Sequence, residues 1–218
     1  MSRSKDDYMK TIAELGGMTN RVGNKAISDS LNVSAASVSE MVHRLQQEGL
    51  VKNIPYQGVS LTPEGRSFAA LVIRRHRIWE VFLYDKLNYP WEDVHEEAED
   101  LEHHASTDFI DRLEAYLDFP KYCPHGGIIP AKDGSMPDML NYRLSGLEVG
   151  HYFQLRRVTD QRDFLLTLND LQLKLEETYQ LVEKATEHLC IQHQGQVYTL
   201  SRQLADHLYI IPLKEPTE

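Results

Sequence analysis

Acidic and histidine side chains recur at helical spacing in the stretch EEAEDLEHH, residues 96–104. On a helix of about 3.6 residues per turn, Glu99, Glu102 and His103 share one face, and His95 lies one turn earlier. Carboxylates this close repel each other, so a purely structural helix gains little from them. The face also adjoins an apolar stripe, where uncompensated carboxylates are costly. A divalent cation would reverse the sign of the interaction, so the pattern predicts a metal site.

Two weaker patterns also combine metal-ligand side chains. His76 and Glu80 are one helical turn apart, and CPHGG places Cys123 and His125 two residues apart in a turn rich in proline and glycine. Pairs of these kinds are often incidental.

HEEAE also differs from the zinc-peptidase motif H-E-x-x-H only by Glu99 at the second histidine position. A metallohydrolase and a metal-independent interaction protein with solvated acidic helices therefore remain alternative interpretations.

Charge is distributed unevenly along the 218 residues. Residues 1–75 contain ten Lys/Arg and seven Asp/Glu, residues 76–130 four and thirteen, and residues 131–218 nine and thirteen. A polyanionic partner would therefore bind the first third of the chain. Two cysteines are too few for a disulfide framework, and the apolar runs are too short to span a bilayer. We expect a cytoplasmic protein that does not enter a membrane.

The first 62 residues have the order of a winged helix-turn-helix domain. We predict helices over 6–15 and 23–31, the second with Ala26 and Ile27 turned inward. A third helix should run from the N-cap Ser34 to Gly49, and a hairpin should follow around Gln57-Gly58. With Val38 at the centre of its buried stripe, the third helix presents small and polar residues on the opposite face. The candidate DNA-binding residues on this helix and the hairpin are Ser34, Ala36, Ser37, Ser39, Glu40, His43, Arg44, Lys52, Tyr56 and Gln57.

Beyond the hairpin, Thr62-Pro63 should start a long helix to about Leu87, and a second long helix is predicted over 91–117. The segment PAKDGSMPDMLN, 130–141, indicates a linker. The short runs HYFQLRRV, QVYTL and LYIIPL after it suit a small β-barrel. The predicted fold is thus mainly α with small β elements, in three domains at 1–72, 73–140 and 141–218.

The sequence as a whole resembles the diphtheria-toxin-repressor family of metal-dependent transcriptional regulators. The most specific marks are DDYMKTIAEL, VSAASVSEMVHRLQQEGLV, LTPEGR, RRHRIWEVFL, EAEDLEHH and HYFQLRRVTD. The likeness is greatest to the three-domain, manganese-responsive members of the streptococcal type. The C-terminal segment LSGLEVGHYFQLRRVTD also resembles the SH3-like domain that these proteins share with a ferrous-iron transport accessory protein.

The resemblance implies two metal sites. The primary site would join Asp7 on the first helix to the acidic face predicted above, and the secondary site would join the middle of the chain to the third domain. The implied primary ligands are Asp7, Glu99, Glu102 and His103, with His76 completing or flanking them and His95 as an ancillary ligand. The implied secondary ligands are Glu80, Cys123, His125 and Asp160.

The resemblance also implies a function: metal binding locks the DNA-binding domain to the dimerisation domain, so that a homodimer binds palindromic operators and represses manganese or iron uptake genes. One dimer, or two, would occupy an operator. Oxygen ligands at Asp7 and Glu99, where iron-type members carry sulfur, favour Mn(II) over softer late metals, with Fe(II) as the alternative, while Zn(II) or Cd(II) would substitute in vitro. Members with paired ions carry Glu where this chain has Lys10, which argues against a second ion there. For the dimer interface we predict the apolar residues Ile78, Trp79, Phe82, Tyr84 and Phe109.

Overall fold

The computed structural model describes residues 4–137 and 142–214 of the chain, which divides into two compact units. The first unit extends to His76 and includes residues 107–111 and 129–137. The second contains residues 77–106, 112–128 and the C-terminal segment. The boundary falls inside the helix α4 (Pro63–Leu87). Among the described residues, none of the helices combines the length and apolarity that crossing a bilayer requires.

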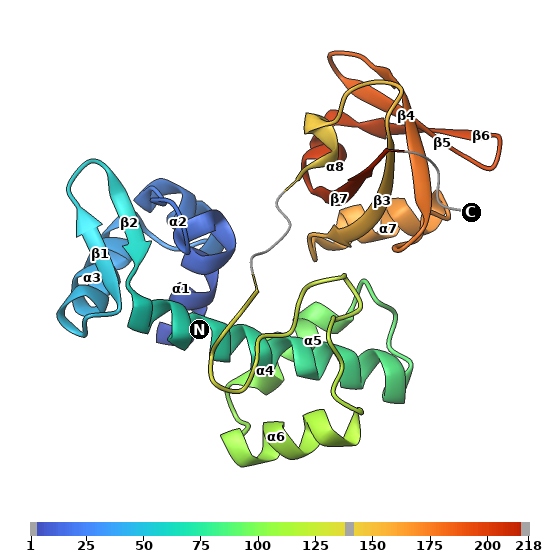
Figure 1. Ribbon diagram of the computed structural model, residues 1–218. Helices are drawn as coiled ribbons and strands as arrows, with labels where there is room; N and C mark the ends of the chain where they lie inside the picture. The colour runs from blue at the N-terminus through green and yellow to red at the C-terminus, as the bar shows by residue number, and fades with distance from the viewer. Residues whose placement is uncertain (1–3, 138–141, 215–218) are drawn as a thin grey trace. The chain divides into compact units, whose positions relative to one another are not determined.

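The first unit begins with a winged helix-turn-helix, as the sequence predicts (Figure 1). Its elements are α1 (Lys5–Ile12), the π-helical turn η1 (Ala13–Gly17), α2 (Asn24–Leu31), α3 (Ala35–Gln47), β1 (Val51–Ile54) and β2 (Gly58–Leu61). Ser34 caps α3 by accepting the Ser37 N–H at 3.1 Å, and Gly49 after the helix has a φ of +74°. Strands β1 and β2 pair antiparallel, and β1 packs on α3.

Apolar side chains from every element of this winged domain meet in one core. Met9, Ile27 and Val38 are fully buried, so the predicted inward stripe of α3 is confirmed. Ala26 was predicted to face inward but is exposed. It lies about 100° around α2 from Ile27, so it flanks the buried stripe instead of belonging to it.

The predicted single helix over 91–117 is wrong, because two helices occupy this range: α5 (Val94–Glu102) and α6 (Thr107–Tyr116). The amide of His104 donates to the Leu101 carbonyl at 3.2 Å, a tight closing turn. Ser106 and Thr107 are residues that favour a helix start over a helix interior. His103 therefore stands at the C-cap of α5.

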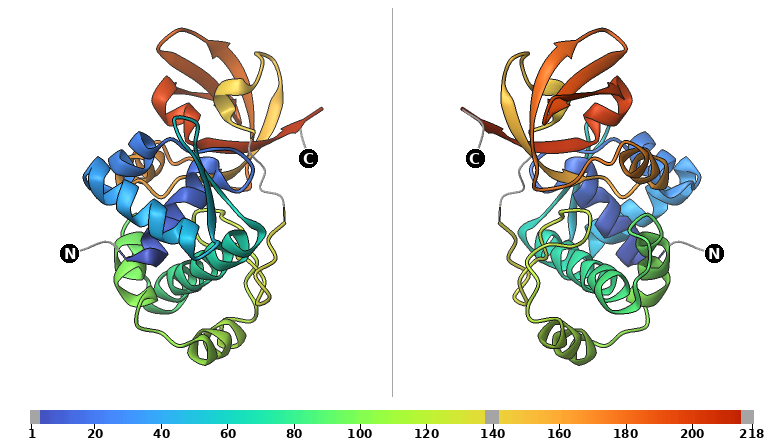
Figure 2. Two further views of the ribbon diagram at one scale, coloured as in Figure 1. Left: turned by 90° about the vertical axis from the view of Figure 1, so that its left-hand side faces the viewer. Right: turned by 90° about the vertical axis from the view of Figure 1, so that its right-hand side faces the viewer.

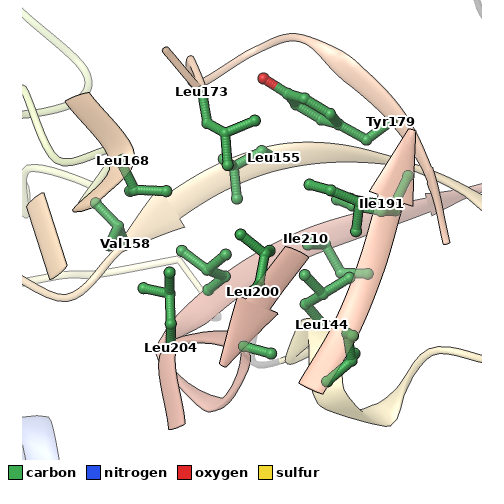
Figure 3. Close-up of a cluster of buried hydrophobic side chains, with 14 of the residues drawn as sticks. Leu144, Leu155, Val158, Leu168, Leu173, Tyr179, Ile191, Leu200, Leu204 and Ile210 are labelled. Carbon is green, nitrogen blue, oxygen red and sulfur yellow. The ribbon is translucent and has the colours of Figure 1, made fainter. Parts of the chain in front are cut away.

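The C-terminal part of the second unit is an SH3-like domain built on an antiparallel sheet in the order β6-β5-β4-β3-β7. The strands are β3 (Tyr152–Val158), β4 (Thr178–Lys184), β5 (His188–His193), β6 (Gln196–Ser201) and β7 (Leu208–Leu213). They curve around a shared apolar core (Figures 1 and 2). Figure 3 shows Leu155, Tyr179, Ile191 and Leu200 directed into that core. The sequence did not predict β4, β5 or the helices η2 (Leu144–Gly146), α7 (Arg162–Asp170) and α8 (Arg202–Asp206).

The predicted linker 130–141 lies partly outside the described residues, at 138–141. The described part forms a hydrogen-bonded turn, in which the Ala131 amide donates to the Ser135 carbonyl at 2.9 Å. Lys132 in this turn pairs with Asp111, which also accepts from Arg74 at 3.0 Å. These ion pairs hold the turn and the start of α6 in the first unit.

Candidate metal centre and DNA interface

Helix α3 presents an exposed polar face on the side opposite Val38. Ala36, Ser37, Ser39, Glu40 and His43 on this face are all exposed. The small side chains of Ala36 and Ser37 near the helix start would let the backbone approach base edges in a major groove. Some of the polar atoms already have local partners, because the hydroxyls of Ser34 and Ser37 lie 2.9 Å apart and Ser39 donates to the Ala35 carbonyl.

The remaining DNA-binding candidates flank this face. Arg44 is exposed and makes an i,i+4 ion pair with Glu48 at 3.2 Å, and Lys52 is exposed on β1. Tyr56 and Gln57 form the tip of the β1–β2 hairpin, where Tyr56 has a φ of +62°. The Gln57 side chain accepts a hydrogen bond from Arg21, so the segment before α2 supports the wing.

On α5, one ligand of the predicted acidic face is buried and two are accessible. The Glu102 side chain is 1% exposed, and its Oε1 lies 3.7 Å from Nε2 of His103, whose side chain is 30% exposed. Glu99 lies one turn earlier, 3.6 Å from His95. The structure thus brings Glu99, Glu102 and His103 together at the C-terminal end of α5. Two carboxylates and an imidazole are a donor set that suits Mn²⁺ or Fe²⁺.

Asp7 lies in the other unit, in the first turn of α1. It accepts the Ser4 amide at 2.7 Å and forms a capping box with that residue. Lys10, one turn later, is 4% exposed, and its Nζ lies 3.4 Å from Nδ1 of His76. Lys10 thus lies beside His76, one of the proposed primary ligands.

Three secondary-site candidates converge in the second unit. Glu80, Cys123 and His125 are all buried, and each offers a ligand atom within 4.8 Å of the others. A tight turn presents the last two, since the Cys123 amide donates to Gly127 and the Gly126 amide donates to Cys123, both at 2.9 Å. Gly126 has a φ of +81°, and a Cβ there would lie 1.9 Å from the carbonyl oxygen of Arg156. Only glycine fits so close to β3.

Both ring nitrogens of His125 face acceptors. Nδ1 lies 3.1 Å from the Glu80 carboxylate, and Nε2 lies 2.7 Å from the carbonyl oxygen of Trp91. Without a metal, both nitrogens must carry protons, which makes the ring an imidazolium. Burial alone would lower the pKa of His125, but the Glu80 charge and the Cys123 contact overcome it and raise the pKa to about 11. A cation at Nδ1 would replace that proton, while the bond to Trp91 would keep the ring oriented.

Asp160 and His95 form a second group that also contacts Glu80. His95 Nδ1 lies 3.1 Å from Asp160 and 3.7 Å from Glu80, and the same ring contacts Glu99 through Nε2. Burial opposes protonation, but Asp160 and Glu80 raise the pKa of His95, and His95 in turn lowers that of Asp160. The sequence grouped Asp160 with Cys123 and His125, and His95 with the acidic face. The structure places His95 between Glu99 of the acidic face and the carboxylates of Glu80 and Asp160.

Comparison with known proteins identifies the family. The DNA-binding domain of iron-dependent repressors matches residues 1–59, and their metal-binding and dimerisation domain matches residues 62–131. The diphtheria toxin repressor of Corynebacterium glutamicum is 33% identical over 201 residues, covering 87% of this chain and 84% of that protein. The chain belongs to the iron-dependent repressor family, which confirms the resemblance seen in the sequence.

Other relatives are named for iron or manganese. The iron-dependent repressor IdeR of Mycobacterium bovis is 36% identical over 123 residues, 56% of this chain, and the chain spans about half (54%) of its length. A manganese-dependent transcriptional repressor solved in complex with manganese is 29% identical with a TM-score of 0.89, covering 96% of this chain and 100% of that one. ScaR with bound zinc is 34% identical with a TM-score of 0.86, covering 96% and 99%, and ScaR has also been solved with cadmium.

Proposed function

We propose that this protein is a manganese-responsive DNA-binding repressor. The observation that carries the proposal is the convergence of Glu99, Glu102 and His103 at the end of α5, inside the segment that matches a metal-binding domain. Their oxygen-rich set favours Mn²⁺, with Fe²⁺ as the alternative, while Zn²⁺ and Cd²⁺ would bind in vitro because affinity generally rises towards the late metals. A bound cation would supply the positive charge that holds the two carboxylates together.

Asp7 is the proposed link from metal binding to DNA binding. It lies on α1 of the winged domain, whereas Glu99, Glu102 and His103 lie at the C-terminal end of α5 in the second unit. A ligand set drawn from both units would favour one relative orientation of them, and a ligand shifts an equilibrium only by its differential affinity for the two states. Glu80, Cys123, His125, His95 and Asp160 would instead tie the helical segment to the SH3-like domain, so they would support the switch only indirectly.

The proposed target is a palindromic operator read by a homodimer. The net charge of the winged domain is small, which predicts weak binding by one copy, since neutralised phosphates supply much of the binding energy. Two copies related by a twofold axis would read two half-sites, and one or two dimers would occupy an operator. The target genes would be those of manganese or iron uptake, and the protein would act in the cytoplasm, where the chromosome is.

The test is a DNA-shift titration on the protein's own upstream region and on metal-transporter promoters, with Mn(II) and with a chelator. The parent protein should bind only with Mn(II). Glu99→Gln should need far more Mn(II), whereas Glu97→Gln, which removes the same charge from an exposed position on α5, should behave like the parent. Equal shifts with and without metal would contradict the proposal. Ester or peptide turnover by the metal-loaded protein would favour a metallohydrolase instead.

A further inference from the structure

A third group of ligand-type side chains lies in the SH3-like domain, away from both proposed sites. Glu183, His188 and Cys190 each offer one ligand atom within 4.8 Å of the others. They belong to the antiparallel hairpin of β4 and β5, and none of them belongs to the apolar core of the domain. We propose that this hairpin carries a separate site for a thiophilic divalent cation, of which Zn²⁺ is the expected one.

Strand alternation places the thiol and the imidazole on the outer face of the sheet. Leu189 and Ile191 of β5 are buried in the core, so His188 and Cys190 point the other way. Cys190 is nonetheless only 8% exposed. Its Sγ lies 3.7 Å from the Thr199 hydroxyl on the paired strand β6.

A β-bulge brings the carboxylate to the same face. Leu181 pairs with Ile191 and points into the core, so regular alternation would direct Glu183 inward as well. The register shifts between Leu181 and Glu183, with the result that Glu183 pairs with Cys190. Bulges of this kind re-aim side chains and are frequent next to functional sites. The extra residue in β4 therefore puts Glu183 beside the thiol on the outer face.

The distances allow a metal with small side-chain rotations. Ligand atoms on a tetrahedral Zn²⁺ lie about 3.5 Å apart, from Zn–S and Zn–N bonds of about 2.3 and 2.0 Å. Glu183 Oε1 and His188 Nε2 already lie 3.4 Å apart, and their side chains are 60% and 41% exposed and free to adjust. One thiolate, one imidazole and one carboxylate leave a fourth position for water.

The ligand chemistry separates this site from the oxygen-rich set on α5. A thiolate favours Zn²⁺ and disfavours Mn²⁺, whereas Glu99 and Glu102 accept Mn²⁺. Binding would release to solvent the thiol proton of Cys190 and any proton on the ligating nitrogen of His188, and would replace the Glu183–His188 contact with bonds to one cation. It would also clamp the two strands at the end of the hairpin.

Site-resolved alkylation tests this in the full-length parent protein. The rate at which iodoacetamide modifies Cys190 is followed by peptide mass spectrometry, with and without Zn(II), and Cys123 is read separately on its own peptide. Zn(II) should slow modification of Cys190 at least about tenfold, and His188→Ala and Glu183→Gln should abolish this protection while sparing that of Cys123. Zn(II)-independent modification of Cys190 in the parent would overturn the proposal.

Cobalt(II) gives an independent readout. In a Cys123→Ser variant, Cys190 is the only thiol, so a thiolate-to-cobalt charge-transfer band there must come from the hairpin. Cobalt in excess over all the proposed sites should produce that band, and a further Cys190→Ser change should remove it. A matched variant, His151→Ala, changes an exposed histidine elsewhere in the domain and should keep the band. Absence of the band in folded Cys123→Ser protein would refute the site.

Discussion

Glu80→Gln should remove about half of the pH dependence of stability that the buried histidines give the metal-free protein. Glu80 is buried and faces two imidazoles, His125 at 3.1 Å and His95 at 3.7 Å. Among the described residues, His125 forms an ion pair with Glu80, whereas His95 also pairs with Asp160 at 3.1 Å, a partner that the substitution leaves in place. The substitution should therefore return the pKa of His125 towards its ordinary range and leave His95 protonated.

The raised pKa values of the two histidines determine whether stability falls or rises with pH. The pKa of His125 is about 11 in the folded protein and about 6.5 when unfolded, so its protonation stabilises the fold fully below pH 6.5. That contribution declines as pH rises towards 11, by up to about 1.4 kcal/mol per pH unit for one imidazole. Between pH 6.5 and 8.5 the parent should lose up to about 6 kcal/mol from the two imidazoles, and Glu80→Gln about half of that.

Urea unfolding in chelator at several pH values measures the effect. The slope of unfolding free energy against pH should be about half as steep in Glu80→Gln as in the parent, and the destabilisation should be largest near pH 6.5. Glu97→Gln, with the same charge change on exposed α5, should match the parent slope. Equal slopes for parent and Glu80→Gln would refute the imidazolium assignment for His125.

Three further predictions follow from the same structure. Gly126→Ala should cost several kcal/mol of unfolding free energy in urea, because its Cβ would lie 1.9 Å from the Arg156 carbonyl oxygen, and a parent-like midpoint would contradict that packing. Glu40→Ala should change base preference in a binding-site selection by about 1–3 kcal/mol at one position, whereas Arg44→Ala should weaken all sequences alike and flatten the salt dependence. Light scattering should show a dimer, and Phe109→Asp, at a side chain 47% exposed, should shift it towards monomer.

The dimer prediction also shows where sequence periodicity misleads. Ile78 was predicted to lie at the interface, but it is fully buried within its own chain. Trp79 is partly buried, while Tyr84 and Phe109 are 45% and 47% exposed. An apolar residue on a long helix can face either its own domain or a partner, and spacing alone does not separate the two. Only the packed structure shows which side chains remain available.

Elements with strong local signals could be predicted from the sequence. The caps at Ser34 and Gly49 and the start at Thr62 depend on neighbouring backbone groups, so the winged domain follows from local chemistry. The break after His103 was missed, because the apolar spacing of α5 continues in register into α6 and hides the Ser106-Thr107 start signal.

Which of the candidate metal ligands lie close together could be established only from the folded structure. The acidic face of α5 is local, and its convergence follows from helical spacing. The position of His95 between Glu99, Glu80 and Asp160 depends on how β3 packs on the helical segment, which no spacing encodes. The same holds for the group at Cys190, because the register shift after Leu181 that turns Glu183 outward is visible only in the sheet.

The measurement that tests the central claim most directly is Mn(II)-dependent operator binding by Asp7→Ala beside the parent, followed by fluorescence anisotropy. His125→Ala serves as the control at the secondary site and should lose only part of the metal stimulation. Asp7→Ala should remain folded and dimeric and should lose the Mn(II) stimulation, because it removes the only ligand proposed within the DNA-binding domain, residues 1–72. If Asp7→Ala responds to Mn(II) like the parent, the proposed link between the two units is contradicted.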